Sequence, residues 1–251
     1  MSRTERIEGR NPVLECLVRG RRSVRKVWLD RGAKPEPRVD RIRALCAERG
    51  VPLEVVARPL LDQMCLGRVH NGVVADADVL PDFSTADILN GLPFGHDPLI
   101  VLADGLSYEH NLGAVLRSCL GFGVDALVVP TRRGAQLSPV VSRVAMGGAE
   151  VVPVVHEGLF VSLRALKDAD VQVVGADMDG LPADQVDLRG ALALIVGEEG
   201  GGLSSKLRER CRAVVSIPLS GALESLNVSV ATGILLYEKR RQDRLGWTKG
   251  A

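Results

Sequence analysis

Residues 217–238 read IPLSGALESLNVSVATGILLYE, and this stretch decides the fold class of the C-terminal part of the chain. A strand-like end at Ile217 runs through a loop with Gly and Ser into apolar residues spaced as on a helix with a broad buried face. Ser225 and Asn227 stand at the start of that helix, where side-chain oxygens accept hydrogen bonds from backbone N–H groups. The same N–H groups can face a ligand, so the stretch predicts either an ordinary capped core helix or one wall of a binding site.

A second informative stretch lies upstream at residues 99–130, LIVLADGLSYEHNLGAVLRSCLGFGVDALVVP. It predicts a buried strand at 99–103, a helix that begins at Asn111 and ends at Gly121 and Gly123, and another strand at 124–129. Alternation of short apolar strands with helices is typical of an α/β domain with a parallel sheet.

Arg117 stands out within the helix that this second stretch predicts. Its neighbours are apolar or small, which predicts a partly buried guanidinium that needs an acceptor partner. That partner is either a ligand or a local carboxylate such as Asp104 or Glu109.

A third glycine-bearing element reads ALALIVGEEGGGLS at residues 191–204. A buried-strand run ends at Gly197, and loops at the carboxyl ends of parallel strands are where ligands bind in open α/β sheets. The loop lacks the Lys followed by Ser or Thr of a phosphate-binding loop, and its two adjacent carboxylates would repel phosphate. It predicts a neutral or cationic ligand, or else a flexible turn with exposed acids.

Taken together, these elements resemble the SpoU (TrmH-type) RNA ribose 2′-O-methyltransferases of the SPOUT superfamily. NLGAVLR at 111–117, LIVGEEGGGLS at 194–204 and the stretch at 217–238 match the three motifs of that family, in order. Within it the chain is most similar to the RlmB type, which methylates a guanosine of 23S ribosomal RNA, because IEGRNPVLECL at 7–17 and VHNGVVA at 69–75 also match.

Two departures from the family pattern concern loops. Tyr108 and Glu109 replace the Asp and Pro that usually precede the first motif, so a loop geometry fixed by proline is not expected here. Met146 and Gly147, in AMGGAE at 145–150, replace a common pair of small residues, which bears on fine specificity more than on chemistry.

The resemblance implies a C-terminal domain with a parallel sheet and a deep trefoil knot, an exception to the rule that chains do not thread their loops. It also implies S-adenosylmethionine as cofactor and a homodimer. The residues that would bind the cofactor, largely through backbone groups, are Gly197, Gly200, Ile217, Leu219 and Leu226. The implied catalytic residues are Asn111, Arg117, Glu199, Ser225 and Asn227, with Glu199 orienting the site rather than neutralising the sulfonium.

Arg117 has two alternative roles under this resemblance. It is the residue nominated to draw the proton from the ribose 2′-hydroxyl, although arginine is an unusual base because its pKa is normally above 12. It could instead bind the adjacent phosphate and so orient the ribose. Both roles predict that Arg117 is essential.

The net charge of +1 hides an uneven distribution along the chain. Residues 1–76 carry 16 Lys or Arg and 10 Asp or Glu, whereas residues 77–251 carry 16 and 21. A basic N-terminal domain predicts a phosphate-binding surface, although a solvated helix end would look similar. The clustered candidates for RNA contact are Arg19, Arg21, Arg22, Arg25 and Lys26. Because aromatic residues make up only 3% of the chain, shape and phosphate contacts are expected to dominate over base stacking.

We therefore expect an RNA substrate-binding domain at 1–76, a linker at 77–97 and a methyltransferase domain at 98–251. The N-terminal domain reads as a small α/β unit, similar through the family to RNA-binding folds of ribosomal proteins. Its expected elements are a helix around 12–19, a strand at 24–29, a helix at 39–49 and a strand at 53–56.

The remaining residue types favour a cytoplasmic protein without a metal. Five scattered cysteines without metal-type spacing predict reduced thiols, and the four histidines form no ligand pattern. We also expect no signal peptide and no membrane span, since MSRTERIEGR has no apolar core and no apolar run reaches 18 residues.

Other functions stay open at this point. A tRNA substrate or an antibiotic-resistance role on ribosomal RNA would use the same motifs. A catalytically inactive RNA-binding protein with this fold is disfavoured because all five polar motif residues are present. An unrelated nucleotide-binding α/β enzyme is disfavoured because no GxGxxG or phosphate-loop pattern follows the early strands.

Overall fold

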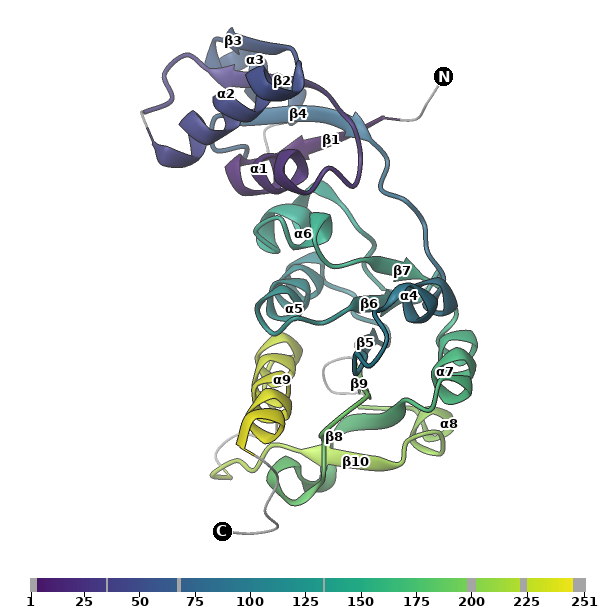
Figure 1. Ribbon diagram of the computed structural model, residues 1–251. Coiled ribbons are helices and arrows are strands. Elements are labelled where there is room, and N and C mark those ends of the chain that lie inside the picture. The colour runs from purple at the N-terminus through teal and green to yellow at the C-terminus, as the bar shows by residue number, and fades with distance from the viewer. Residues whose placement is uncertain are drawn as a thin grey trace. The chain divides into compact units, whose positions relative to one another are not determined.

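The computed structural model describes residues 4–34, 36–66, 69–132, 134–197, 202–221 and 225–245. It contains two compact units (Figure 1). The N-terminal unit comprises Met1–Pro81 with Leu137–Val151, and the C-terminal unit comprises Asp82–Gln136 with Val152–Ala251. The segment at 137–151 therefore packs with the start of the chain, although the residues before and after it belong to the other unit. The domain limits expected from composition and motifs stay a prediction.

The N-terminal unit is a four-stranded sheet with helices on both faces. The strand order is β1-β4-β2-β3, in which β4 pairs antiparallel with β1 and β2, and β2 pairs parallel with β3. Its elements in chain order are β1 (Thr4–Glu8), α1 (Arg10–Arg19), β2 (Val24–Asp30), α2 (Pro37–Arg49), β3 (Leu53–Val56), α3 (Arg58–Met64), β4 (Val73–Asp78), α6 (Pro139–Val144) and the 3-10 helix η1 (Gly148–Glu150).

The alternation of side chains along β4 divides the core of this unit into two layers. Val73, Ala75 and Ala77 face the larger cluster, which α1 and α2 complete. Val74 faces a smaller cluster on the opposite side, with residues of β3 and α3. Gly20 and Gly50 cap the C-terminal ends of α1 and α2 in the left-handed conformation. Each helix therefore ends where the sequence supplies a residue that tolerates positive φ.

One buried ion pair ties η1 to the rest of the N-terminal unit. The side chains of Arg22 and Glu150 are only 4% and 1% exposed, and the Arg22 guanidinium bonds both Glu150 carboxylate oxygens. Arg22 Nη1 also donates to Glu5 Oε2 at 2.8 Å and to the carbonyl oxygen of Asp78 at 3.2 Å. This network joins residues 128 positions apart in the chain, and it fixes the segment at 137–151 on the N-terminal unit.

The C-terminal unit is a six-stranded, all-parallel sheet in the order β10-β8-β9-β5-β6-β7. Its elements are α4 (Thr85–Gly91), β5 (Leu99–Ala103), α5 (Glu109–Gly121), β6 (Ala126–Val129), β7 (Val154–His156), α7 (Leu159–Asp168), β8 (Gln172–Pro182), η2 (Ala183–Gln185), β9 (Leu192–Val196), α8 (Ser205–Arg208), β10 (Ala213–Ser216) and α9 (Val228–Leu245).

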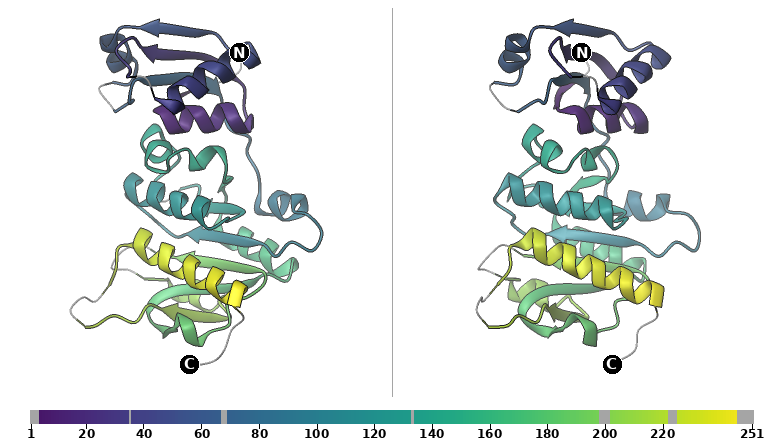
Figure 2. Two further views of the ribbon diagram at one scale, coloured as in Figure 1. Left: turned by 60° about the vertical axis from the view of Figure 1, so that its left-hand side comes forward. Right: turned by 90° about the vertical axis from the view of Figure 1, so that its left-hand side faces the viewer.

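Helices cover both faces of this sheet, as Figures 1 and 2 show. The helices α5 and α9 pack together on one face, and α4, α7 and α8 cover the other. Every residue of β5 and β9 is buried, which explains why these strands read as continuous apolar runs rather than as alternating patterns.

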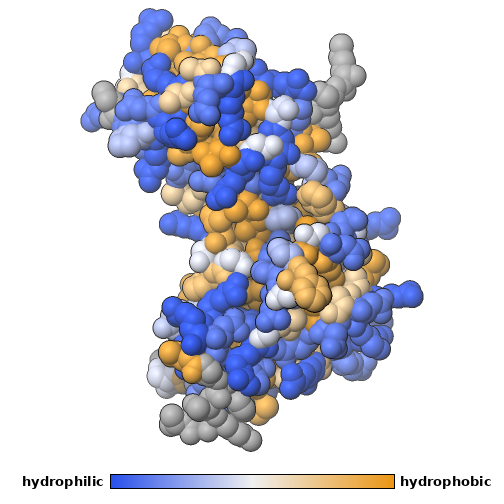
Figure 3. Space-filling model, viewed as in Figure 1, coloured by the Kyte–Doolittle hydropathy of each residue, from blue (hydrophilic) through white to orange (hydrophobic). Residues whose placement is uncertain are grey.

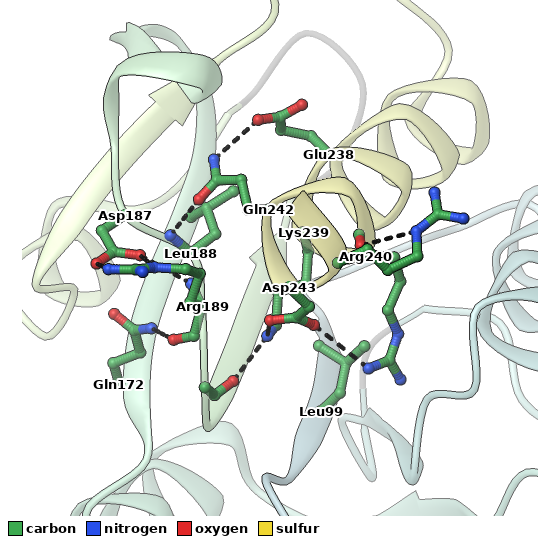
Figure 4. Close-up of polar contacts among 12 residues, drawn as sticks. Leu99, Gln172, Asp187, Leu188, Arg189, Glu238, Lys239, Arg240, Gln242 and Asp243 are labelled. Atoms are coloured by element: carbon green, nitrogen blue, oxygen red, sulfur yellow. Dashed lines mark hydrogen bonds and ion pairs between the residues drawn. The ribbon is translucent and has the colours of Figure 1, made fainter. Parts of the chain in front are cut away.

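The C-terminal half of α9 is held by polar contacts to the segment between β8 and β9 (Figure 4). The backbone N–H of Leu188 donates to Gln242 Oε1 at 2.8 Å, and Lys239 Nζ donates to the carbonyl oxygen of Gly190 at 2.8 Å. Lys239 is buried and also pairs with Asp243 Oδ1 at 2.6 Å, so its charge is compensated. These contacts fix the direction of α9 and with it the position of its N-terminal end.

Asp187, in the same segment, provides a test at low pH. Its two carboxylate oxygens accept from Arg189 at 2.9 and 2.8 Å, and these hydrogen bonds lower the pKa of Asp187 to about 2. Because the pKa is lowered, the stabilisation of the fold by the Asp187–Arg189 pair is complete at pH values above the ordinary aspartate pKa of about 4. It is lost as the pH falls through about 2. Because the pair is partly exposed, Asp187→Asn should lower the free energy of unfolding by under about 1 kcal/mol at pH 7. Urea unfolding should show the difference vanish near pH 2, and a constant difference across that window would contradict the assignment.

The elements expected from the sequence are present. The helix expected around 12–19 is α1, and the one expected at 39–49 is α2, which begins two residues earlier at Pro37. The helix expected from Asn111 begins at Glu109, and the strand expected at 124–129 begins only at Ala126. The stretch expected to be a linker contains a helix of its own, α4, which a capping box at Ser84 and Asp87 begins.

Within the described ranges, no helix is long and apolar enough to cross a membrane, and no three His, Cys, Asp or Glu side chains form a group that could hold a metal ion. All five cysteines lie in the described part of the chain, and they form no disulfide. Burial raises the pKa of the Cys16 thiol to about 12 and that of Cys211 to about 11, so both are poor nucleophiles at neutral pH.

Candidate functional site

A pocket of about 280 Å³ opens in the C-terminal unit at the carboxyl ends of β9 and β10 and over the middle of β8, which lies between them. The ends of β9 and β10 and residues 176–178 in the middle of β8 form its floor, and the loop at 217–219 and the start of α9 form its sides. Its walls are mainly apolar, with a few polar groups from Asp177, Ser216 and Ser225. A concave apolar site with sparse polar groups at this edge of a parallel sheet is typical of a small-molecule site.

Two glycines make the β9 side of this pocket. A Cβ atom at Gly197 would lie 2.8 Å from the carbonyl carbon of Gly202 and closer still to its oxygen, so only glycine fits there. Gly202 has a φ of +57°, and a Cβ atom on it would lie 2.7 Å from Asp177 Oδ2. These glycines let the loop pack closely against itself and against β8, and both also line the pocket.

Two asparagines meet beside the pocket, one from each helix on that face of the sheet. Asn227 Nδ2 donates to Asn111 Oδ1 at 3.0 Å, and Asn111 lies in the first turn of α5. Asn227 Oδ1 accepts from the backbone N–H of Ser229 at 2.9 Å, which confirms Asn227 as the cap of α9. The motif at 217–238 therefore forms both a capped helix and a pocket wall.

Arg117 lies on the exposed side of α5. The expectation of a partly buried guanidinium was wrong, because Val115, Leu116 and Cys119 point to the core while the side chain at 117 is rotated away from it. An exposed guanidinium is accessible to a phosphate group of a bound ligand.

The sequence of the chain matches family models over most of its length. Residues 98–237 match the family model described as SpoU rRNA Methylase, and residues 6–81 match the one described as RNA 2′-O ribose methyltransferase substrate binding. The chain belongs to the SpoU rRNA methylase family. The resemblance inferred from the three motifs is confirmed, as is an α/β fold in which a parallel-sheet methylase domain follows a substrate-binding domain.

Relatives of this SpoU chain include named RNA methyltransferases. It is 38% identical to the 23S rRNA (guanosine-2′-O-)-methyltransferase RlmB of Pseudomonas putida, over 96% of this chain and 98% of RlmB. A crystal structure of an RNA 2′-O ribose methyltransferase is 28% identical, with a TM-score of 0.80 over 96% of this chain and 89% of that one. The SpoU methyltransferase AviRb from Streptomyces viridochromogenes in complex with AdoMet is 25% identical, with a TM-score of 0.78 over 98% and 92% of the two chains.

The structure brings most of the SpoU residues expected to bind the cofactor to one place. Gly197, Ile217, Leu219 and Leu226 all line the pocket, and Ser225 lines it too. The other two expected residues of the second motif, Gly200 and Glu199, lie outside the described residues.

The five residues expected to contact RNA are placed differently from one another. Arg22 is committed to the buried pair with Glu150 described above. Arg19 and Arg25 are exposed, and they pair with Glu15 and Asp78 at 3.4 and 2.8 Å. Lys26 pairs with Glu54 at 2.8 Å and lies over the Trp28 ring, whereas Arg21 is half-buried and donates to the carbonyl oxygen of Ala149. The four other than Arg22 therefore stay the candidates for RNA contact. Figure 3 shows that hydrophilic residues cover much of one face of the molecule, between separate hydrophobic patches.

Asp177 is a pocket residue that the sequence reading missed. Its Oδ2 accepts from the backbone N–H of Leu203 and from Arg208 Nη1, both at 2.9 Å, and its Oδ1 accepts from the N–H of Met178 at 2.8 Å. These bonds hold the end of the glycine loop against β8. The available signal was the carboxylate that directly follows the apolar stretch at 173–176.

The close contact at Gly197 leads to a prediction about cofactor affinity. Gly197→Ala should weaken S-adenosylmethionine binding by more than roughly tenfold, because the added methyl group displaces the backbone at Gly202. Isothermal titration calorimetry measures the affinity. Gly121→Ala is the matched control, since a Cβ atom there meets nothing within 4 Å, and it should bind the cofactor normally. Unchanged affinity in the Gly197 variant would rule out this wall as the cofactor site.

Proposed function

We propose that this chain is an S-adenosylmethionine-dependent RNA ribose 2′-O-methyltransferase that acts on a guanosine of 23S ribosomal RNA. The observation that carries the proposal is the convergence of the second and third SpoU motifs on one pocket at the carboxyl ends of β9 and β10. The similarity to RlmB over nearly the whole of both chains supports the choice of RNA target.

The residues present fit the cofactor. Gly197 and Gly202 line the pocket, and its mainly apolar walls would exclude water from a bound flat ring. Backbone N–H and carbonyl groups of Ile217, Leu219 and Leu226, which line the same pocket, would offer further donors and acceptors. When bound, the cofactor supplies an activated methyl group on a sulfonium.

The polar motif residues would prepare the ribose for the reaction. A 2′-hydroxyl is a poor nucleophile, so its orientation and the removal of its proton decide the rate. Arg117, exposed on α5, is available to bind the phosphate beside the reacting ribose. Asn111 and Asn227, bonded to each other beside the pocket, would position polar groups of the nucleotide, with Ser225 and Glu199 orienting the site.

A homodimer acting in the cytoplasm is part of the same proposal. Val230, Ile234 and Tyr237 recur at helical spacing along α9, and all three are exposed. An apolar stripe on a helix supports burial against a second copy of the chain. Light scattering should give the mass of a dimer, and a monomer at micromolar concentration would contradict this part.

The experiment that tests the function is methyl transfer from labelled S-adenosylmethionine to unmodified 23S ribosomal RNA and, in parallel, to bulk tRNA. Label in ribosomal RNA alone is the expected result. Label in tRNA alone would keep the chemistry and change the target. No label in either RNA, despite cofactor binding, would favour an RNA-binding protein without turnover.

A further inference from the structure

A second cavity, of about 180 Å³, lies wholly within the N-terminal unit. Its walls come from residues 9–12 at the start of α1, Asn71 in the turn before β4, and Arg143 and Met146 in and after α6. Two of these stretches carry the motifs of the RlmB-like subgroup, and Met146 is one of the two departures from the family pattern. None of them contributes to the cofactor pocket, so these stretches have no role in the function proposed so far.

Positive charge dominates the walls of this cavity. Three guanidiniums line it, from Arg10, Arg38 and Arg143, against the single carboxylate of Glu36. The buried carboxylate of Glu8 lies 4.0 Å from Arg143 Nη1, so one net positive charge remains. Three arginine forks around a small space suit an anion with several acceptor oxygens.

Contacts with the surrounding protein hold the guanidiniums in place. Arg10 Nε donates to the carbonyl oxygen of Asn71 at 2.8 Å, and Arg10 Nη1 pairs with Glu36. Arg143 Nη1 donates to the carbonyl oxygen of Val69 at 3.1 Å. Side chains held in this way lose less conformational freedom when a ligand binds.

The backbone around the cavity adopts conformations that side chains disfavour. Asn71 has a φ of 50° and Met146 a φ of 58°, and they are two of only four non-glycine residues with positive φ in the described part of the chain. A Cβ atom at the next residue, Gly147, would lie 2.8 Å from Glu15 Cγ. Such geometry persists where the surrounding structure requires it, and it clusters at binding sites.

We propose that this cavity binds one phosphate-bearing nucleotide of the substrate RNA, which rests on the proposed function. The arginines would hold the phosphate, and the amides of Asn11 and Asn71 would hydrogen-bond an edge of an unpaired base. The cavity is smaller than the roughly 300–1,000 Å³ of sites for drug-sized ligands, so it takes the phosphate and one edge of a single nucleotide, and the rest of that nucleotide stays outside it.

The first test compares Arg38→Ala with Arg43→Ala by filter binding of an unmodified 23S ribosomal RNA transcript. Both arginines are exposed on α2, and only Arg38 lines the cavity, so the two variants change the net charge equally. For Arg38→Ala we expect the slope of log affinity against log salt to fall by about one, which is the loss of one phosphate contact. Arg43→Ala should keep the wild-type slope, and equal slopes for the two variants would overturn the proposal.

The second test locates the ligand directly and does not depend on methyl transfer. Titration of the full chain with guanosine 5′-monophosphate should shift the backbone amide resonances of Asn11 and Asn71 in NMR spectra, and inorganic phosphate should bind less tightly. No shift at these residues would overturn the site, and equal affinity for phosphate would overturn the base contact. If the chain transfers methyl groups normally and Arg38→Ala and Arg43→Ala show the same salt dependence, the cavity is refuted and the proposed function stands. If the two variants differ in salt dependence but the chain transfers no methyl group, only the proposed chemistry is refuted.

Discussion

Arg117→Ala should reduce methyl transfer by a factor of roughly 10²–10⁴ while it leaves the affinity for S-adenosylmethionine within about twofold. The side chain is exposed on α5, outside the residues that line the cofactor pocket, so its removal should not disturb the pocket. Steady-state kinetics with RNA and calorimetry with the cofactor measure the two quantities separately.

Arg164→Ala is the matched control, because this side chain is also exposed on a helix of the C-terminal unit and is 85% accessible. It should retain wild-type activity. Arg117→Lys keeps the charge and loses the planar fork, so a phosphate-binding role predicts partial activity with an unchanged pH profile. Equal loss of activity and cofactor affinity in the alanine variant would refute the assignment.

Glu150→Ala should lower the free energy of unfolding of the N-terminal unit by about 3–5 kcal/mol, since it leaves the buried Arg22 guanidinium without its bidentate partner. Glu5 still pairs with Arg22 but is half-exposed, so it replaces little of the lost interaction. Hydrogen exchange of the α1 amides reports the stability of this unit separately from the other.

Two further variants identify the cause of that loss. Glu54→Ala removes an exposed pair with Lys26 in the same unit and should cost under about 1 kcal/mol. The double variant Arg22→Met, Glu150→Leu should recover much of the stability, because neither charge is then buried alone. A Glu150→Ala cost as small as that of Glu54→Ala would show that the pair does not hold the segment at 137–151.

Much of the fold follows from local sequence pattern. The buried strands β5 and β9 and the helices α1, α2, α5 and α9 could be predicted because their apolar spacing and terminal glycines act within a few residues. The pocket residues 197, 217, 219 and 226 could be predicted only through the family resemblance, because no spacing shows that the ends of β9 and β10 lie close together.

Contacts between distant residues explain what the sequence could not show. Arg22 reads as one of five clustered cations, yet its partner Glu150 lies 128 positions away. Arg117 has apolar neighbours along the chain, but each residue of a helix points about 100° from the next, so the neighbours face the core and Arg117 does not. Asp177 depends on Leu203 and Arg208, which no local motif connects to it. The trefoil knot that the resemblance implies stays a prediction.

The proposed reaction is transfer of a methyl group to a ribose of ribosomal RNA at a cofactor pocket formed by the SpoU motifs. The most direct measurement is mass spectrometric mapping of the nucleotide modified when the purified chain acts on unmodified 23S ribosomal RNA with S-adenosylmethionine. We expect a single 2′-O-methylguanosine, formed far more slowly when Arg117→Ala replaces the wild-type chain. A methyl group on a base, or an unmodified transcript under conditions in which the chain binds both cofactor and RNA, would contradict it.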